Sequence, residues 1–257
     1  MRIHDVVLAV HVPVALACVP AWWVPLLVRK GGRAHVLVGR AFVAGIIWVA
    51  LTGMVMGALR LLAPEELAPG ADAAALARLR ASGPFFLYLG TITLAPTIHG
   101  WRVVRTRRAP EALRSVFDVG VLALAVLGSV GAVLCGLLLP GAPTVLLLSM
   151  SPIGIGVGLA GLAYVRAPRS HPTGWWIAHR AQMIGAGIAV HTAFGVFVVS
   201  RWIAPGLAGW WQLLPWLLPS AIGVPAILLS LRAAARHVDR EGSARRGFGR
   251  GERGGPE

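Results

Sequence analysis

Seven long apolar segments constrain the fold of this chain more than any other feature of its sequence. A helix needs about 20 mostly apolar residues to cross the hydrocarbon core of a bilayer, and within that core only helices and closed barrels satisfy their own backbone hydrogen bonds. The segments cover residues 5–28, 36–62, 84–104, 115–139, 144–166, 177–202 and 213–232. The sequence therefore predicts an all-α fold, a polytopic membrane helix bundle with seven transmembrane helices.

The composition agrees with a membrane protein and argues against a soluble one. The apolar set makes up 56% of the 257 residues, and 13% are charged, whereas soluble domains carry about 25% charged residues. A net charge of +14 on a soluble protein would suggest nucleic-acid binding, but here the arginines lie between the apolar segments. We therefore expect the lipid bilayer as a partner and no nucleic acid.

The basic residues predict the orientation of the bundle. Of the 24 lysines and arginines, 19 fall at or after the ends of the first, third, fifth and seventh segments, or at the start of the segment that follows. Because cytoplasmic loops carry the excess of positive charge, the N-terminus is expected outside and the C-terminus in the cytoplasm. The chain then divides into a transmembrane domain, residues 1–232, and a basic cytoplasmic tail, residues 233–257, which is predicted to be disordered.

A glycine motif in the fifth segment matches a dinucleotide-binding fingerprint only in its letters. Gly156, Gly158 and Gly161 have the spacing, but no strand precedes them and they lie inside an apolar segment. Small residues at helical spacing more often let membrane helices approach closely. No nucleophile–base pair, carboxylate dyad or phosphate-binding loop appears in the sequence, which leaves open whether the protein is an enzyme.

Five histidines lie within or at the edge of the predicted helices, where ionisable groups are rare and usually face the protein interior. His35, His99 and His179 adjoin arginines at the cytoplasmic end and form a predicted inner layer. His11 and His191 each lie nine or ten residues from an arginine at the external end, which places both about 14 Å below that surface. We expect this outer pair to share one site if the first and sixth helices are neighbours.

Two histidines at one depth on different helices are the usual axial ligands of a b-type haem. Gly187, His191 and Gly195 fall on one helix face and predict a groove that a flat macrocycle could fill. Arg40 and Arg180 lie near the cytoplasmic boundary, where they could pair with haem propionates. The candidate haem-binding residues are therefore His11, His35, His99, His179, His191, Gly187, Gly195, Arg40 and Arg180, and no metal other than haem iron is predicted.

Other roles for these residues stay open. A histidine within a span can handle protons or hydrogen-bond across helices. His179 and His191 are 12 residues apart, about 120° in rotation, so either their helix is distorted or they face different neighbours. Asp118 lies four residues after Arg114, which predicts an i,i+4 ion pair.

Several stretches of the sequence carry a family resemblance. They are His11, then Lys30-Gly31-Gly32-Arg33-Ala34-His35, then Gly39-Arg40-Ala41-Phe42, and finally His179-x-x-x-Met183 followed by Thr192-Ala193-Phe194. The chain resembles an uncharacterised bacterial membrane-protein family, the domain of unknown function number 2306. The resemblance covers the first, second and sixth segments, with Val36 where the family has a basic residue. It implies a multi-pass protein of the bacterial cytoplasmic (inner) membrane, and it implies no reaction.

Three functions from different classes remain. The histidines favour a haem b protein that moves electrons in the membrane. Prolines that interrupt several segments, together with Asp118, Arg40 and Arg180 near the inner face, favour a transporter or exporter of a small molecule or ion. A non-catalytic assembly or scaffold protein is the third. The redox partner, the substrate and the oligomeric state are not predicted.

Overall fold

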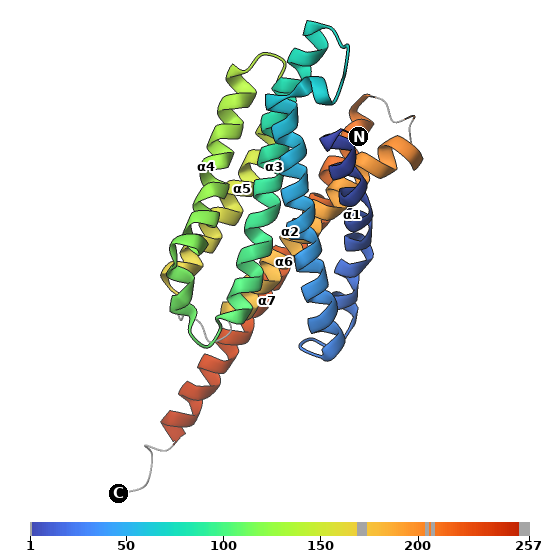
Figure 1. Ribbon diagram of the computed structural model, residues 1–257. Coiled ribbons are helices and arrows are strands. Elements are labelled where there is room, and N and C mark those ends of the chain that lie inside the picture. Colours follow the sequence, from blue (N-terminus) through green and yellow to red (C-terminus); the bar gives the residue numbers. More distant parts are fainter. Residues whose placement is uncertain (1, 169–173, 204–205, 207–208, 252–257) are drawn as a thin grey trace, which may run out of the picture.

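The structure is a computed structural model that describes residues 2–168, 174–203, 206 and 209–251. Helices account for nearly all of this part of the chain, as the apolar segments predict (Figure 1). The seven long helices are α1 (Ile3–Leu27), α2 (Arg33–Leu62), α3 (Ala73–Arg105), α4 (Val116–Leu138), α5 (Thr144–Arg166), α6 (Gly174–Phe194) and α7 (Leu214–Gly251). A π-helical segment, Gly195–Ile203, continues α6.

Neighbouring helices run in opposite directions through the bundle. The connections from α1 to α2 and from α3 to α4 lie at one end, and those from α2 to α3 and from α4 to α5 lie at the other (Figure 1). Behind them, α6 and α7 cross the bundle obliquely. All of these helices except α3 are long and apolar enough to cross a membrane. For α6, this span includes part of the π-helical segment that continues it. This arrangement supports a multi-pass membrane protein.

The exception, α3, is the helix most enclosed by protein. It packs against α2, α4, α5 and α6, and it contains more buried residues than any other described helix. Thr91, Thr93 and Thr97 lie in its buried part and donate hydrogen bonds to carbonyls one turn earlier, at 2.7–3.0 Å. A helix surrounded by protein does not need a lipid-facing apolar surface, which explains its lower hydropathy.

Most helix ends agree with the apolar segments. The bounds of α1, α2, α4 and α5 lie within three residues of the prediction. By contrast, α3 begins at Ala73, well before residue 84, because Asp72 caps it by accepting a hydrogen bond from the Ala75 amide at 2.7 Å. The backbone of α7 continues as a helix to Gly251, through part of the tail that was expected to be disordered. Ala233–Ala235 favour this continuation because alanine is the best helix former.

Glycines let α5 pack closely on α4. A Cβ atom at Gly158 would lie 2.7 Å from the Leu122 carbonyl oxygen, and one at Gly161 would overlap the Leu122 side chain. A Cβ atom at Gly156 would meet nothing within 4 Å. Packing therefore uses two of the three glycines of the apparent dinucleotide motif, and the motif lies inside a helix as expected.

Candidate functional site

Two histidines of the predicted inner layer, on α2 and α6, make similar hydrogen bonds to backbone carbonyls of α1 and α3. His35 on α2 has its Nδ1 atom 3.1 Å from the Pro25 carbonyl oxygen, and His179 on α6 has its Nδ1 atom 2.9 Å from the Gly100 carbonyl oxygen. A carbonyl only accepts, so each Nδ1 carries the proton and each Nε2 of the neutral ring keeps its lone pair. The two imidazoles lie close enough to interact electrostatically. Within the described chain, neither Nε2 atom has a hydrogen-bond partner.

The third member of this layer, His99 on α3, is almost completely buried. Only 2% of its surface is exposed, and neither ring nitrogen makes a hydrogen bond within the described part of the chain. Its ring lies edge-on to Tyr164 of α5, with 6.0 Å between the centroids. Gln182 on α6 is also buried, and its Oε1 atom has no partner among the described residues either. Buried polar atoms without partners are rare, and each calls for an explanation in terms of ligand, water or mechanism.

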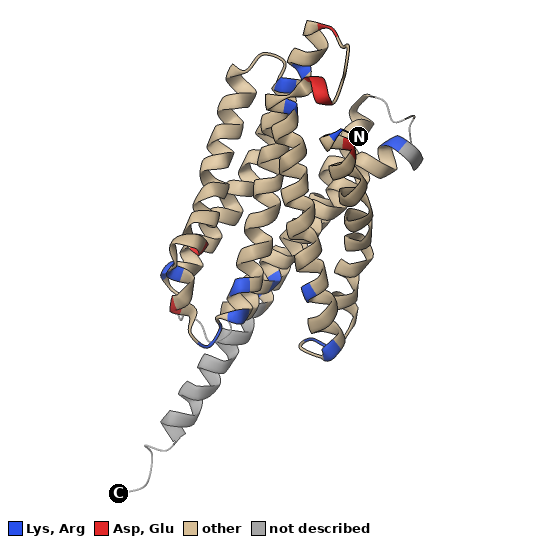
Figure 2. Ribbon diagram, in the orientation of Figure 1, with Lys and Arg blue, Asp and Glu red and all other residues tan. Residues whose placement is uncertain are grey.

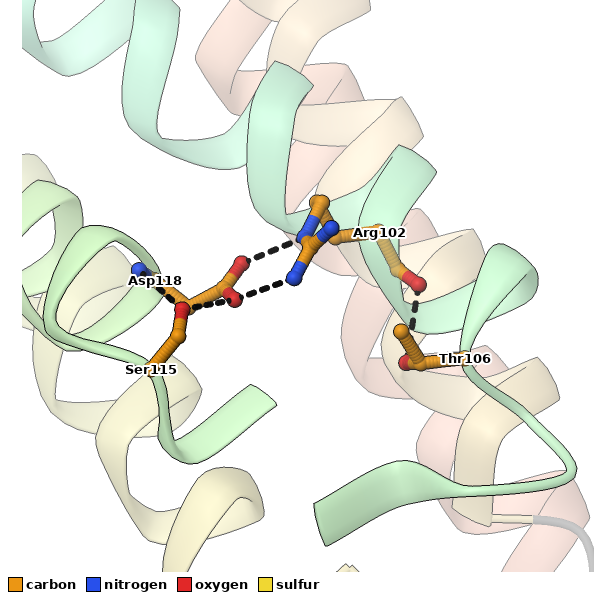
Figure 3. Close-up of polar contacts among 4 residues, drawn as sticks. All are labelled: Arg102, Thr106, Ser115 and Asp118. Atoms are coloured by element: carbon orange, nitrogen blue, oxygen red, sulfur yellow. Dashed lines mark hydrogen bonds and ion pairs between the residues drawn. The ribbon is translucent and has the colours of Figure 1, made fainter. Parts of the chain in front are cut away.

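A buried ion pair lies beside His99. Arg102 of α3 donates two hydrogen bonds to the Asp118 carboxylate of α4, at 2.8 and 2.6 Å (Figure 3). Ser115 donates to the same carboxylate at 2.6 Å and accepts from the Asp118 amide at 3.1 Å, which caps the start of α4. Asp118 is 2% exposed and within electrostatic range of His99. The ion pair therefore joins α3 to α4 next to the unpartnered imidazole.

The predicted pair of Asp118 with Arg114 is wrong. Arg114 ends a short 3-10 turn, Pro110–Arg114, and α4 begins only after Ser115. The two residues are therefore not on one helix, and i,i+4 geometry does not apply. The Arg114 guanidinium instead donates to the carbonyl oxygen of Arg166 at 3.0 Å, at the end of α5.

His191 lies in a cluster of tryptophans rather than beside an open groove. The Trp23 indole donates to its Nε2 atom at 3.0 Å, and its Nδ1 atom lies 2.8 Å from the Gly187 carbonyl oxygen. Both ring nitrogens are therefore engaged, since an indole N–H only donates and a carbonyl only accepts. Trp22 fills the space beside Gly187, where a Cβ atom would overlap its ring. Pro215 lies against Gly195: a Cβ atom added at Gly195 would lie 3.3 Å from the Pro215 side chain. The groove predicted along Gly187, His191 and Gly195 is thus occupied by protein.

The structure does not bring His11 and His191 together. His11 bonds through Nδ1 to the Thr52 hydroxyl of α2 at 2.8 Å, whereas His191 contacts Trp23. Twelve residues of α1 separate His11 from Trp23, about 18 Å along the helix. The expected common depth assumed that α1 and α6 stand parallel, but α6 crosses the bundle obliquely (Figure 1). His179 and His191 face α3 and α1 respectively, so the alternative of different neighbours is correct.

The two predicted propionate partners have different neighbours. Arg40 lines a groove on α2 and α3 with Trp101 and Arg105, and the Arg180 guanidinium lies 5.3 Å from the centre of the Trp176 ring. Neither joins Asp118, so the polar group assumed for a transporter does not form. Sequence reasoning missed Arg102 and Gln182 as site residues. The signal available for Arg102 was that it is the one arginine of the apolar segment 84–104, and Asp118 is the one acidic residue of the next segment, 115–139.

The described residues contain no group of three or more histidine, cysteine or acidic side chains that could hold a metal ion.

A comparison of the chain with family models, with curated proteins and with solved structures finds no match. The resemblance to domain of unknown function number 2306 therefore stays a prediction.

Proposed function

We propose that this chain is an integral membrane protein that binds one haem b between α2 and α6 and takes part in electron transfer. His35 and His179 would be the axial ligands. The observation that carries the proposal is their shared geometry: each Nδ1 atom is fixed by a backbone carbonyl, and each Nε2 atom is left with its lone pair. Metal-ligating histidines almost always have this second hydrogen bond, which orients the ring and raises its basicity.

The surroundings of the two histidines suit a macrocycle. Phe42, Val43 and Ile46 of α2 and Ala186 of α6 form an apolar cluster with Trp22 and Met183 packed against it. An apolar environment of this kind tunes the potential of a haem iron. Arg180 follows His179 directly and is exposed, so its guanidinium is the best placed of the two predicted arginines to pair with a propionate. Bound haem would supply one-electron chemistry at this site.

We also propose the complete topology, with seven membrane spans, the N-terminus outside and the C-terminus in the cytoplasm. Charged residues gather near the two ends of the bundle and leave its middle uncharged (Figure 2). The end that holds the α1–α2 and α3–α4 connections carries most of the described arginines, as expected for a cytoplasmic face. His35 and His179 lie toward that end. The bacterial inner membrane and membership of the resembled family belong to this proposal.

Optical spectroscopy tests the haem proposal. We expect the protein purified from a haem-supplied host to show the reduced-minus-oxidised bands of a low-spin, bis-histidine haem. His35→Ala and His179→Ala should each abolish these bands, because one remaining ligand does not give the six-coordinate spectrum. His191→Ala is the matched control, since both of its ring nitrogens are engaged by protein groups. A wild-type protein without haem bands, or bands that survive in both ligand variants, would refute the proposal.

The buried polar cluster supports a second candidate, proton or solute transport. His99 and Gln182 have unpartnered atoms, and Asp118 is buried within range of His99. Ionisable groups buried in membrane proteins often mark proton or ion pathways. One variant, His99→Leu, distinguishes the two candidates. It should keep the haem spectrum. If this cluster is a transport site, it should also abolish proton-coupled flux in reconstituted vesicles. No particular residue supports a scaffold role.

A further inference from the structure

An open groove runs along α2 and α3. It has a cavity volume of about 470 Å³ and is lined by Arg40, Val43, Ala44, Ile47, Trp101 and Arg105. The first four residues come from α2 and the last two from α3. Neither of the two proposed haem ligands belongs to it, although Val43 is also part of the apolar cluster described above.

The groove changes from cationic to apolar along its length. Arg40 lies near the start of α2, and Arg105 is the last residue of α3, so both lie toward the same end of the bundle. Val43, Ala44 and Ile47 follow Arg40 along α2 by three, four and seven residues, about 4–11 Å deeper along the helix. The cationic end and the apolar wall follow one another as the phosphate and the acyl chains of a phospholipid do, with the phosphate at the membrane surface and the acyl chains below.

The two arginines have no acidic partner. Within the described part of the chain, no ion pair joins Arg40 or Arg105 to a carboxylate. The Arg105 guanidinium lies 4.9 Å from the centre of the Trp101 ring, an arrangement that orients it while leaving donors free. Two guanidinium groups without counter-charges at the mouth of an apolar groove complement a phosphate that carries acyl chains.

We propose that this groove binds an anionic phospholipid of the inner leaflet, with its phosphate between Arg40 and Arg105 and an acyl chain along Val43, Ala44 and Ile47. Basic sites between membrane helices on the cytoplasmic side recognise anionic head groups in this way. A free phosphate would leave the apolar wall without a partner, and a zwitterionic lipid would not neutralise the two arginines. The inference depends on the membrane setting of α2 and α3 and not on haem.

Native mass spectrometry of the whole protein released from detergent tests the proposal. We expect added phosphatidylglycerol to remain bound, and phosphatidylcholine with the same acyl chains to bind much more weakly. Arg40→Gln and Arg105→Gln should each lower the affinity about fivefold, since each basic group near the surface is worth about 1 kcal/mol. Arg78→Gln is the matched control, because Arg78 is an exposed arginine at the other end of the bundle. Its lipid binding should equal that of the wild type.

A second variant tests the apolar wall without removing charge. Ala44→Trp fills the groove, and it should abolish phosphatidylglycerol binding while keeping both arginines. Glycerol phosphate, which has the head-group charge and no acyl chain, should not compete. Equal binding of the two lipids, unchanged binding in both arginine variants, or full competition by glycerol phosphate would each overturn the proposal. The haem spectrum should be the same in Arg105→Gln, which changes a residue outside the haem site, so failure here is distinct from failure of the haem site.

Discussion

The side chains of Arg102 and Asp118 are buried to different extents. The Asp118 side chain is 1% exposed and that of Arg102 is 28% exposed. Removing one partner of a buried pair is costly mainly because it leaves the other charge without compensation. The carboxylate is the member that water reaches least, so the pair depends more on its arginine than on its aspartate.

This asymmetry gives a prediction for thermal unfolding in detergent. Arg102→Met should destabilise the protein by about 3 kcal/mol, because it leaves a buried carboxylate without a cation. Asp118→Asn should cost about 1 kcal/mol, because water can still solvate part of the remaining guanidinium. The double variant Arg102→Met with Asp118→Leu should recover most of the loss. Equal effects of the two single variants would show that Asp118 is hydrated.

In the contact between α4 and α5, two glycines that are close in sequence likewise have different surroundings. Gly158 lies directly against the backbone of α4, and Gly156, only two residues away, faces open space. Helix contacts of this kind depend on which face each small residue occupies, and the number of glycines alone does not determine them.

We therefore predict opposite outcomes for two alanine substitutions in one motif. Gly158→Ala should lower the unfolding temperature, with a cost of about 1–3 kcal/mol, because its Cβ atom would force α4 away from α5. Gly156→Ala should leave the unfolding temperature unchanged or raise it, because alanine favours the helix. A dinucleotide fingerprint would make the first glycine essential, so a severe defect in Gly156→Ala with none in Gly158→Ala would contradict the packing interpretation.

The sequence predicts helices well and their partners poorly. Apolar length alone placed α4 and α5 almost to the residue, because the bilayer requires that length. Depth along a helix failed for His191, since counting residues from the boundary assumes an upright helix. Partners such as Arg102 for Asp118, or Trp22 for Gly187, depend on which helices are neighbours. The hydrophobic periodicity of a single sequence does not show which helices are neighbours.

For the molecule as a whole, the number of spans depends on α3. Its 33 residues are long enough to cross a bilayer. Its composition, however, is not apolar enough to place it among the helices that could cross a membrane. If α3 crosses, the connections before and after it lie on opposite sides of the membrane. If it does not, both lie on one side.

Cysteine accessibility in intact cells distinguishes these two topologies. We expect a cysteine at Gly70 to react with a membrane-impermeant thiol reagent from outside, and a cysteine at Arg108 to react only after the cells are opened. Cys18 is buried and Cys135 partly buried, and both should be replaced by serine or alanine first. Labelling of both positions from the same side would exclude the seven-span topology.

The central position of α3 has a consequence for how the chain enters the membrane. A segment whose threonines and glycines are covered by neighbours gains little from contact with lipid, so in the seven-span topology it is a poor substrate for insertion by itself. Gly57 of α2 and Gly83 and Gly90 of α3 allow these two helices to approach closely. We therefore expect α2 and α3 to leave the insertion machinery as a preformed hairpin, with α2 shielding its partner during biogenesis.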